Sequence, residues 1–285
     1  MTQRNRKIRT WASGLPRRVD EYDFDRPLRR YFSRLAGADR LPIVHVTHVH
    51  AARRIVETAK LTTKLCEVFA KSLAYFFVLK PAYLGKFDRE KSDFLDYFPV
   101  AFILKPEAVP APYHVYPFDT GGAATGAFKA RANRLVPLED YELETSHEAA
   151  VGFIGWAFGS TAAYYDGMLR HHLSTELSPA DSVATGYVAI ARLGVPGDPE
   201  HDMRAATLEL ASADAIDLAG NVLLTIIPKQ LLESQDRFGQ ALDALKATGA
   251  MIETYDWQPN RAPAEFQRDL LRLARVWYAE NGLDV

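Results

Sequence analysis

The chain has 285 residues, of which 48% are hydrophobic and 25% are charged, a composition typical of a folded globular protein. No apolar run reaches the roughly 20 residues that a transmembrane helix needs, and the N-terminal sequence lacks the apolar segment of a secretory signal. The single cysteine, Cys66, excludes a disulfide framework and a zinc site built on cysteines. We therefore expect a cytoplasmic protein that does not associate with membranes.

The net charge is −2, but it is unevenly distributed along the chain. Residues 1–40 contain eleven Lys and Arg against five Asp and Glu, so the remaining residues carry a net charge of −8. A basic arm of this kind can bind the phosphates of DNA or RNA, although a solvated tail has the same composition. We expect residues 1–40 to form a basic arm with one helix, and residues 41–285 to form a single domain.

The first half of the chain predicts strands that alternate irregularly with helices. Continuous apolar runs bounded by Lys-Pro pairs indicate buried strands, and apolar residues at helical spacing indicate helices. The expected strands are 43–46, 73–79, 98–104 and 114–116, and the expected helices are 27–35, 48–60 and 148–158.

The second half is expected to contain strands first and helices last. The predicted strands are 183–193, 204–210 and 221–227, and the predicted helices are 229–232, 237–248 and 262–281. Pro263 lies in the first turn of the last helix and Gly282 follows it, as is typical of helix ends. Because no regular strand–helix–strand rhythm is present, the pattern predicts an α+β protein rather than a doubly wound one.

The segment from residue 43 to residue 61, IVHVTHVHAARRIVETAKL, is the most distinctive in the chain. Side chains alternate along a strand, so His45 and Thr47 are expected on one face. The following helix then begins at about His48. A polar pair at a strand end, beside a helix N-terminus, suits a ligand.

Two later segments complete a candidate constellation. Residues 75–83, YFFVLKPAY, form a strand that leaves the core and ends in Lys80 and Tyr83. Residues 204–210, RAATLEL, place Glu209 between two leucines. A carboxylate at such a position is costly to bury unless it is paired or functional. Alternation along the strand also allows Glu209 to lie on a solvated face.

In their order, these segments resemble the ADP-ribosyltransferase fold, in particular its DNA-modifying DarT-like branch and related prokaryotic toxins. In that family a His-x-Thr strand precedes a helix, an aromatic strand follows, and a late strand carries a glutamate. The resemblance covers roughly residues 41–235. Arginine often precedes the proline of the aromatic strand, whereas this chain has Lys80, which cannot make the bidentate contact of a guanidinium. The resemblance implies a mixed, mainly antiparallel two-sheet core with peripheral helices.

The resemblance also implies NAD as the substrate. Glu209 would be the catalytic carboxylate, and His45 would bind the ribose next to nicotinamide and share the catalytic role. Thr47 would support the same pocket, and Tyr75 or Tyr83 would stack on nicotinamide. Arg204 or Lys80 would contact the pyrophosphate. The whole protein would then be an ADP-ribosyltransferase of toxin or phage-defence type.

Other interpretations remain open from the sequence. The acceptor of ADP-ribose could be DNA, RNA or protein, and an antitoxin or another protein could be a partner. With water as the acceptor the enzyme would be an NAD glycohydrolase. A noncatalytic nucleotide-binding module and a metal-dependent hydrolase that uses His45 and His48 are the further alternatives.

Overall fold

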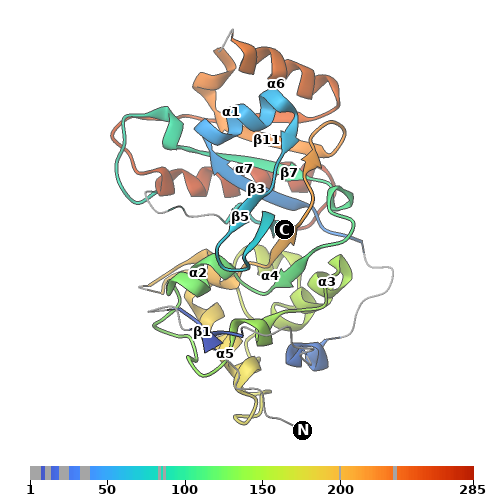
Figure 1. Ribbon diagram of the computed structural model, residues 1–285, viewed down its shortest axis with the longest axis vertical. Coiled ribbons are helices and arrows are strands. Elements are labelled where there is room, and N and C mark those ends of the chain that lie inside the picture. Colours follow the sequence, from blue (N-terminus) through green and yellow to red (C-terminus); the bar gives the residue numbers. More distant parts are fainter. Residues whose placement is uncertain are drawn as a thin grey trace. The chain divides into compact units, whose positions relative to one another are not determined.

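The computed structural model describes residues 8–9, 14–18, 26–32, 39–82, 85, 88–198, 200–233 and 236–285 (Figure 1). The chain divides into two compact units. The first comprises the described parts of residues 1–39 together with residues 67–69 and 113–210, and the second comprises residues 40–66, 70–112 and 211–285. Each unit is therefore assembled from segments that are distant in the sequence. The single domain expected for residues 41–285 stays a prediction.

The second unit is built around one mainly antiparallel sheet. Its strands lie in the order β12–β11–β7–β3–β6, with β5 pairing to β6, and the only parallel pair among them is β11 with β12. The strands are β3 (Ile43–His48), β5 (Lys64–Cys66), β6 (Lys71–Val78), β7 (Pro99–Leu104), β11 (Val222–Pro228) and β12 (Met251–Tyr255). The expected α+β class with mostly antiparallel strands is thus confirmed.

Helices cover both faces of this sheet. All six residues of β7 are buried, and because successive residues of a strand point to opposite faces, neither face of β7 is open to solvent. Helix α1 (Val49–Thr58) packs on α6 (Arg237–Ala247), while α7 (Gln267–Glu280) packs on β11 and β12. The short strands β4 (Lys60–Leu61) and β10 (Ile216–Asp217) pair with each other.

Strand β3 lies between β6 and β7 and leads directly into α1. Its register pairs His45 with Phe102 and Thr47 with Val100. The strand runs two residues further than expected, to His48, and the helix begins at Val49, whose N–H donates to the carbonyl of Phe98 (2.9 Å). His45 and Thr47 therefore share one face of the sheet, as the alternation predicted.

The first unit is mostly helical and has an aromatic core. Its largest fully buried side chains include Phe118, Phe128, Tyr141, Phe153 and Tyr187. Its regular elements are β1 (Ile8–Arg9), β2 (Arg17–Arg18), β8 (His114–Tyr116), α2 (Thr120–Thr125), α3 (His147–Ala157), α4 (Thr161–Tyr165) and α5 (Ser182–Ala191). Strand β9 (Glu209–Ser212) begins in this unit.

Single-turn 3₁₀ helices connect many of these elements. They are η1 (Pro27–Tyr31), η2 (Leu95–Tyr97), η3 (Pro106–Ala108), η4 (Leu138–Tyr141), η5 (Arg192–Gly194), η6 (Met203–Ala206), η7 (Lys229–Glu233) and η8 (Pro263–Phe266). The predicted helix 27–35 is described only as η1, since residues 33–38 lie outside the described residues. The predicted helix 262–281 is divided into η8 and α7.

Two predicted strands are wrong. Residues 183–191 belong to helix α5 and residues 192–193 to η5. The Asp181 side chain accepts from the Ala184 N–H (3.0 Å) and caps α5, which is buried almost all round. A continuous apolar run of this kind has no periodicity that separates a buried helix from a buried strand. Residues 203–206 form η6, where the Asp202 side chain accepts from the Arg204 N–H (3.1 Å). Of the predicted strand 204–210, only Glu209 and Leu210 belong to β9.

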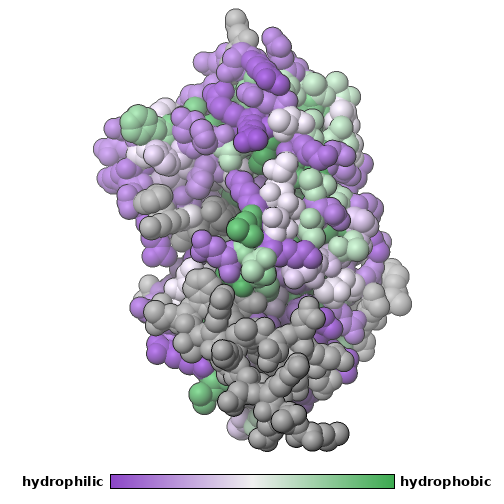
Figure 2. Space-filling view, viewed as in Figure 1, coloured by the Kyte–Doolittle hydropathy of each residue, from purple (hydrophilic) through white to green (hydrophobic). Residues whose placement is uncertain are grey.

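The outer surface of the second unit is polar where α1 and α6 meet solvent, and Figure 2 shows this region as predominantly hydrophilic. Among the described residues, no helix combines the length and the apolar character needed to cross a membrane.

The end of α1 provides a test of the backbone geometry. Ala59 has φ +48° at the C-cap of α1 and is exposed, and this left-handed conformation costs a residue with a Cβ about 1 kcal/mol. We expect Ala59→Gly to raise the free energy of unfolding by about 1 kcal/mol in urea denaturation. Ala51→Gly, inside the same helix, is the control and should lower it by about 0.5–1 kcal/mol. Destabilisation by both variants would contradict the assigned conformation.

Candidate functional site

Glu209 is the first residue of β9 and is a buried carboxylate. Only 2% of its surface is exposed, so the alternative of a solvated face is wrong. Its neighbours Leu208 and Leu210 are fully buried as well, which shows that both faces of the chain are covered here. A carboxylate in such surroundings needs hydrogen bonds to offset the loss of its hydration.

Thr120 supplies two of those hydrogen bonds from the start of α2. Its hydroxyl donates to Glu209 Oε1 (2.6 Å), and its backbone N–H donates to Oε2 (3.2 Å). Thr120 is the first residue of the helix, so its N–H has no acceptor within the helix. Both carboxylate oxygens are thereby fixed by one residue, which determines the orientation of the carboxylate.

His114 is the third group at this carboxylate. Its Nε2 lies 3.3 Å from Glu209 Oε1, and its side chain is 3% exposed. The ring packs against Phe69 and Tyr116, with centroid distances of 4.5 and 5.0 Å. Strand β8 and the start of α2 thus bring an imidazole and a hydroxyl to the same oxygen of Glu209.

A second network of charges holds the start of α2 in place. The Arg204 guanidinium binds Asp202 (2.6 and 2.9 Å) and Asp119 (3.1 Å). Asp119 is also the N-cap of α2, since its side chain accepts from the Gly121 N–H (2.8 Å). The Asp119 N–H donates to the Arg204 carbonyl (3.1 Å). Arg204 therefore positions the residue next to Thr120, and its predicted contact with pyrophosphate stays a prediction.

In the second unit, His45 is held as a neutral imidazole. Its Nδ1 lies 2.9 Å from the Tyr75 carbonyl, and because a carbonyl only accepts, Nδ1 carries the proton and Nε2 is an acceptor. Burial lowers the pKa of His45 to about 4, helped by the nearby Lys64 ammonium and opposed by the Tyr75 carbonyl. The ring lies near Phe76 and Phe102, so its orientation is fixed by packing.

The other predicted site residues of the second unit lie on β3, on β6 or directly after β6. Thr47 is half-buried on the His45 face of β3. Tyr75 donates its hydroxyl to the Cys66 sulfur (2.8 Å), and Lys80 is 2% exposed. Tyr83, the second candidate for stacking on nicotinamide, lies outside the described residues.

The chain turns sharply between Val78 and Lys80. Leu79 has φ +58°, and the Lys80 N–H donates to the Val78 carbonyl two residues earlier (2.6 Å), as in a γ-turn with a left-handed central residue. The Tyr278 hydroxyl donates to the Leu79 carbonyl (2.9 Å) and stabilises the turn. Such strain is concentrated at functional sites, and here it determines where Lys80 lies.

The histidines do not form a metal centre in the described part of the chain. His48 Nε2 lies 2.9 Å from Asp88 Oδ1, whereas His45 binds a backbone carbonyl. Among the described residues, no group of three or more His, Cys, Asp and Glu side chains is arranged to hold a metal ion. Nothing in this geometry favours the metal-dependent alternative.

The predicted site residues fall in both units. Glu209 and Arg204 belong to the first, where the Asp119–Thr120 pair connects their two networks. The second unit contains His45, Thr47, Tyr75 and Lys80. The sequence did not identify Thr120 or His114 as partners of Glu209, because such contacts over a long stretch of chain leave no local pattern. No protein-family model matches the chain, and no curated protein does.

The Thr120 hydroxyl gives the first prediction for this site. Thr120→Val keeps the shape and the backbone N–H but removes the donor to Glu209 Oε1. We expect the free energy of unfolding to fall by about 1–3 kcal/mol, because a buried acceptor loses a partner. Thr125→Val, at the exposed end of the same helix, is the matched control and should change it by less than about 0.5 kcal/mol. Equal effects in urea denaturation would contradict the buried contact.

The pKa of His45 predicts a loss of stability in acid. An unfolded imidazole takes up its proton near pH 6.5, whereas the folded one does so near pH 4. As the pH falls between these values the unfolded state binds more protons, so stability should decrease by about 3 kcal/mol. His45→Gln should lack this part of the decrease, and the exposed His50→Gln is the control. An NMR titration of His45 with a midpoint near pH 6.5 would refute the assignment.

Proposed function

We propose that the chain is an NAD-dependent ADP-ribosyltransferase of the toxin or phage-defence type. The observation that carries this proposal is the Glu209 carboxylate, buried at the start of β9 and oriented through both oxygens by Thr120. The resemblance of the sequence assigns the catalytic glutamate to the same residue. A carboxylate whose orientation is fixed before the substrate binds can stabilise a positive charge without reorganising.

The reaction would proceed by transfer of ADP-ribose from NAD to a nucleophile. The bond between C1′ of the ribose and the nicotinamide nitrogen breaks, and its electron pair leaves with nicotinamide, so positive charge develops on the ribose. The negative charge of Glu209 stabilises this state. A lone pair of the acceptor then forms the new bond to C1′, and the acceptor proton passes to the Glu209 carboxylate or to solvent.

The neutral His45 suits a role in binding the substrate. With Nδ1 donating to the Tyr75 carbonyl, Nε2 is oriented as an acceptor, and a ribose hydroxyl is a matching donor. Because the imidazole stays neutral down to about pH 4, it keeps this acceptor across the physiological range. The Tyr75 ring is fixed through its hydroxyl on Cys66, which suits stacking on nicotinamide.

Two of the predicted site residues carry a positive charge that could bind the two phosphates of NAD. Lys80 is buried behind the γ-turn at Leu79, and the Arg204 guanidinium binds two carboxylates. Lys80 and Arg204 both stay candidates for the pyrophosphate, and using Arg204 would require breaking contacts that hold α2. Residues 1–40 supply further positive charge, which suits DNA or RNA as the acceptor.

The test is to incubate the full chain with NAD labelled in the adenosine part, together with DNA, RNA and cell-lysate protein in separate reactions. We expect nicotinamide release and transfer of label to one of the three. Glu209→Gln, which keeps an acceptor for Thr120, should lower the rate by at least about 100-fold, while the exposed Glu200→Gln should leave it unchanged. His45→Ala should weaken NAD binding about tenfold in calorimetry, through loss of one hydrogen bond.

The outcomes separate the alternatives. Nicotinamide release without labelled acceptor would identify an NAD glycohydrolase. NAD binding without nicotinamide release would identify a noncatalytic binding module, and full activity of Glu209→Gln would remove Glu209 from the catalytic role.

A further inference from the structure

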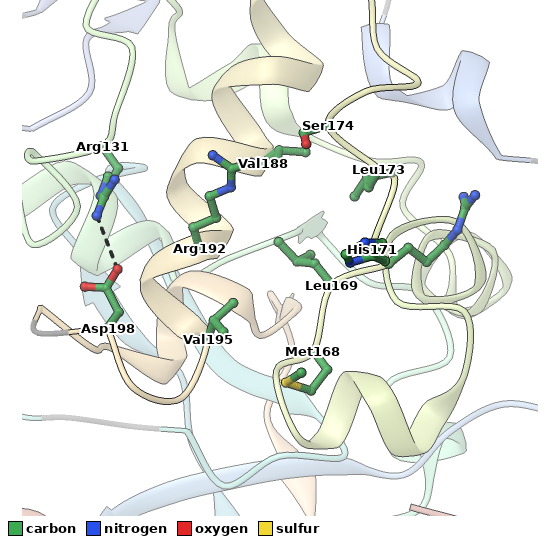
Figure 3. Close-up of a pocket in the computed structure, with 11 residues that line it drawn as sticks. Arg131, Met168, Leu169, His171, Leu173, Ser174, Val188, Arg192, Val195 and Asp198 are labelled. Atoms are coloured by element: carbon green, nitrogen blue, oxygen red, sulfur yellow. Dashed lines mark hydrogen bonds and ion pairs between the residues drawn. The ribbon is translucent and has the colours of Figure 1, made fainter.

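The first unit contains a cavity that the proposed reaction does not use. Its volume is about 400 Å³, within the range of pockets that bind small molecules. The chain between α4 and α5 forms one wall, and the end of α5 with η5 forms another (Figure 3). The apolar part of the lining consists of Met168, Leu169, Leu173, Val188 and Val195.

Three polar side chains of the lining have hydrogen-bonding capacity that no other described residue uses. Arg192 on η5, and Ser174 and His171 on the opposite wall, all line the cavity. Within the described part of the chain, none of these three side chains forms a hydrogen bond or an ion pair. Figure 3 shows Arg192 and Ser174 in the upper half of the view, with His171 beside Leu169. Pockets that bind small molecules are usually lined by apolar side chains with a small number of polar groups.

The two other arginines of the lining are already neutralised. Arg131 binds Asp198 (3.2 Å). The Nη2 of Arg170 donates to both carboxylate oxygens of Glu176 (2.7 and 2.9 Å), and its Nη1 donates to the Trp156 carbonyl (3.0 Å). Among the described residues that line the cavity, Arg192 is therefore the arginine whose charge no carboxylate neutralises, and it favours an anion.

We propose that this cavity binds a small organic phosphate. A guanidinium, a hydroxyl and an imidazole together present donors from separate directions, which suits the tetrahedral oxygens of a phosphate better than the planar pair of a carboxylate. Arg192 and Ser174 hold the phosphate, with His171 as a further donor. The organic body lies on Leu169 and Val188, where burial of its apolar surface adds affinity that inorganic phosphate lacks.

The chemistry fits both a nucleotide and an aliphatic phosphate, so the test uses one probe of each. AMP and hexyl phosphate are titrated into the full chain by calorimetry, with inorganic phosphate for comparison. We expect at least one organic phosphate to bind more tightly than inorganic phosphate. Arg192→Ala should weaken that binding about 10- to 100-fold, and Ser174→Ala about 3- to 10-fold.

Arg134→Ala is the matched control, because Arg134 is exposed, lies three residues from Arg131 and does not line the cavity. It should bind either probe as the unmodified chain does, and thermal unfolding should show that Arg192→Ala keeps its fold, since Arg192 is exposed. His45→Ala is the second control. AMP is part of NAD and could bind at the proposed NAD site, whereas binding at the cavity should not depend on His45.

Three results would overturn the proposal. The first is that neither organic phosphate binds at millimolar concentration. The second is that Arg134→Ala weakens organic phosphate binding as much as Arg192→Ala does. The third is that hexyl phosphate does not bind and AMP binding depends on His45 but not on Arg192. None of them bears on NAD turnover, so this proposal can fail while the proposed function holds.

Discussion

The contact between Thr120 and Glu209 is the interaction on which the candidate chemistry depends. An ionised carboxylate loses several kcal/mol of hydration when it is buried, and charge-assisted hydrogen bonds offset part of that cost. Here a single residue supplies two such bonds, one from its hydroxyl and one from its backbone N–H. The position of Thr120 depends in turn on Asp119, the N-cap of α2, and through it on Arg204. A change in any of these residues would therefore reach the carboxylate.

His45 shows how the same kind of constraint works in the second unit. The backbone of β6 selects its tautomer, and the apolar rings around it hold its orientation and lower its pKa. Buried polar groups of this sort are costly unless they are satisfied, so a fold keeps few of them. Glu209 belongs to this small set, and the half-buried His45 is likewise satisfied, by a backbone carbonyl; this is the physical reason to look for function there. The γ-turn at Leu79 adds a strained backbone close to Lys80 in sequence.

Much of the fold could be predicted from local patterns, and the failures lie where a segment gives no clear local signal. Strand β7 and helix α1 were predicted well because a short apolar run flanked by prolines and a clear helical periodicity are both local signals. Helix α5 was mistaken for a strand because its residues are buried almost all round, which removes the periodicity. Strand β12 was missed because it is only five residues long and only its last residue, Tyr255, is buried, so it has no clear alternation. The motifs made Glu209 and His45 candidates, whereas the partner Thr120 lies 89 residues from Glu209, beyond any local signal.

A double-mutant cycle between Thr120 and Glu209 tests the central claim most directly, with the rate of nicotinamide release from NAD as the readout. If Thr120 acts by holding the carboxylate, Thr120→Val lowers the rate in the unmodified chain but has no further effect in Glu209→Gln. The two effects are then strongly non-additive. Additive effects, or a chain that releases no nicotinamide from NAD, would contradict the account.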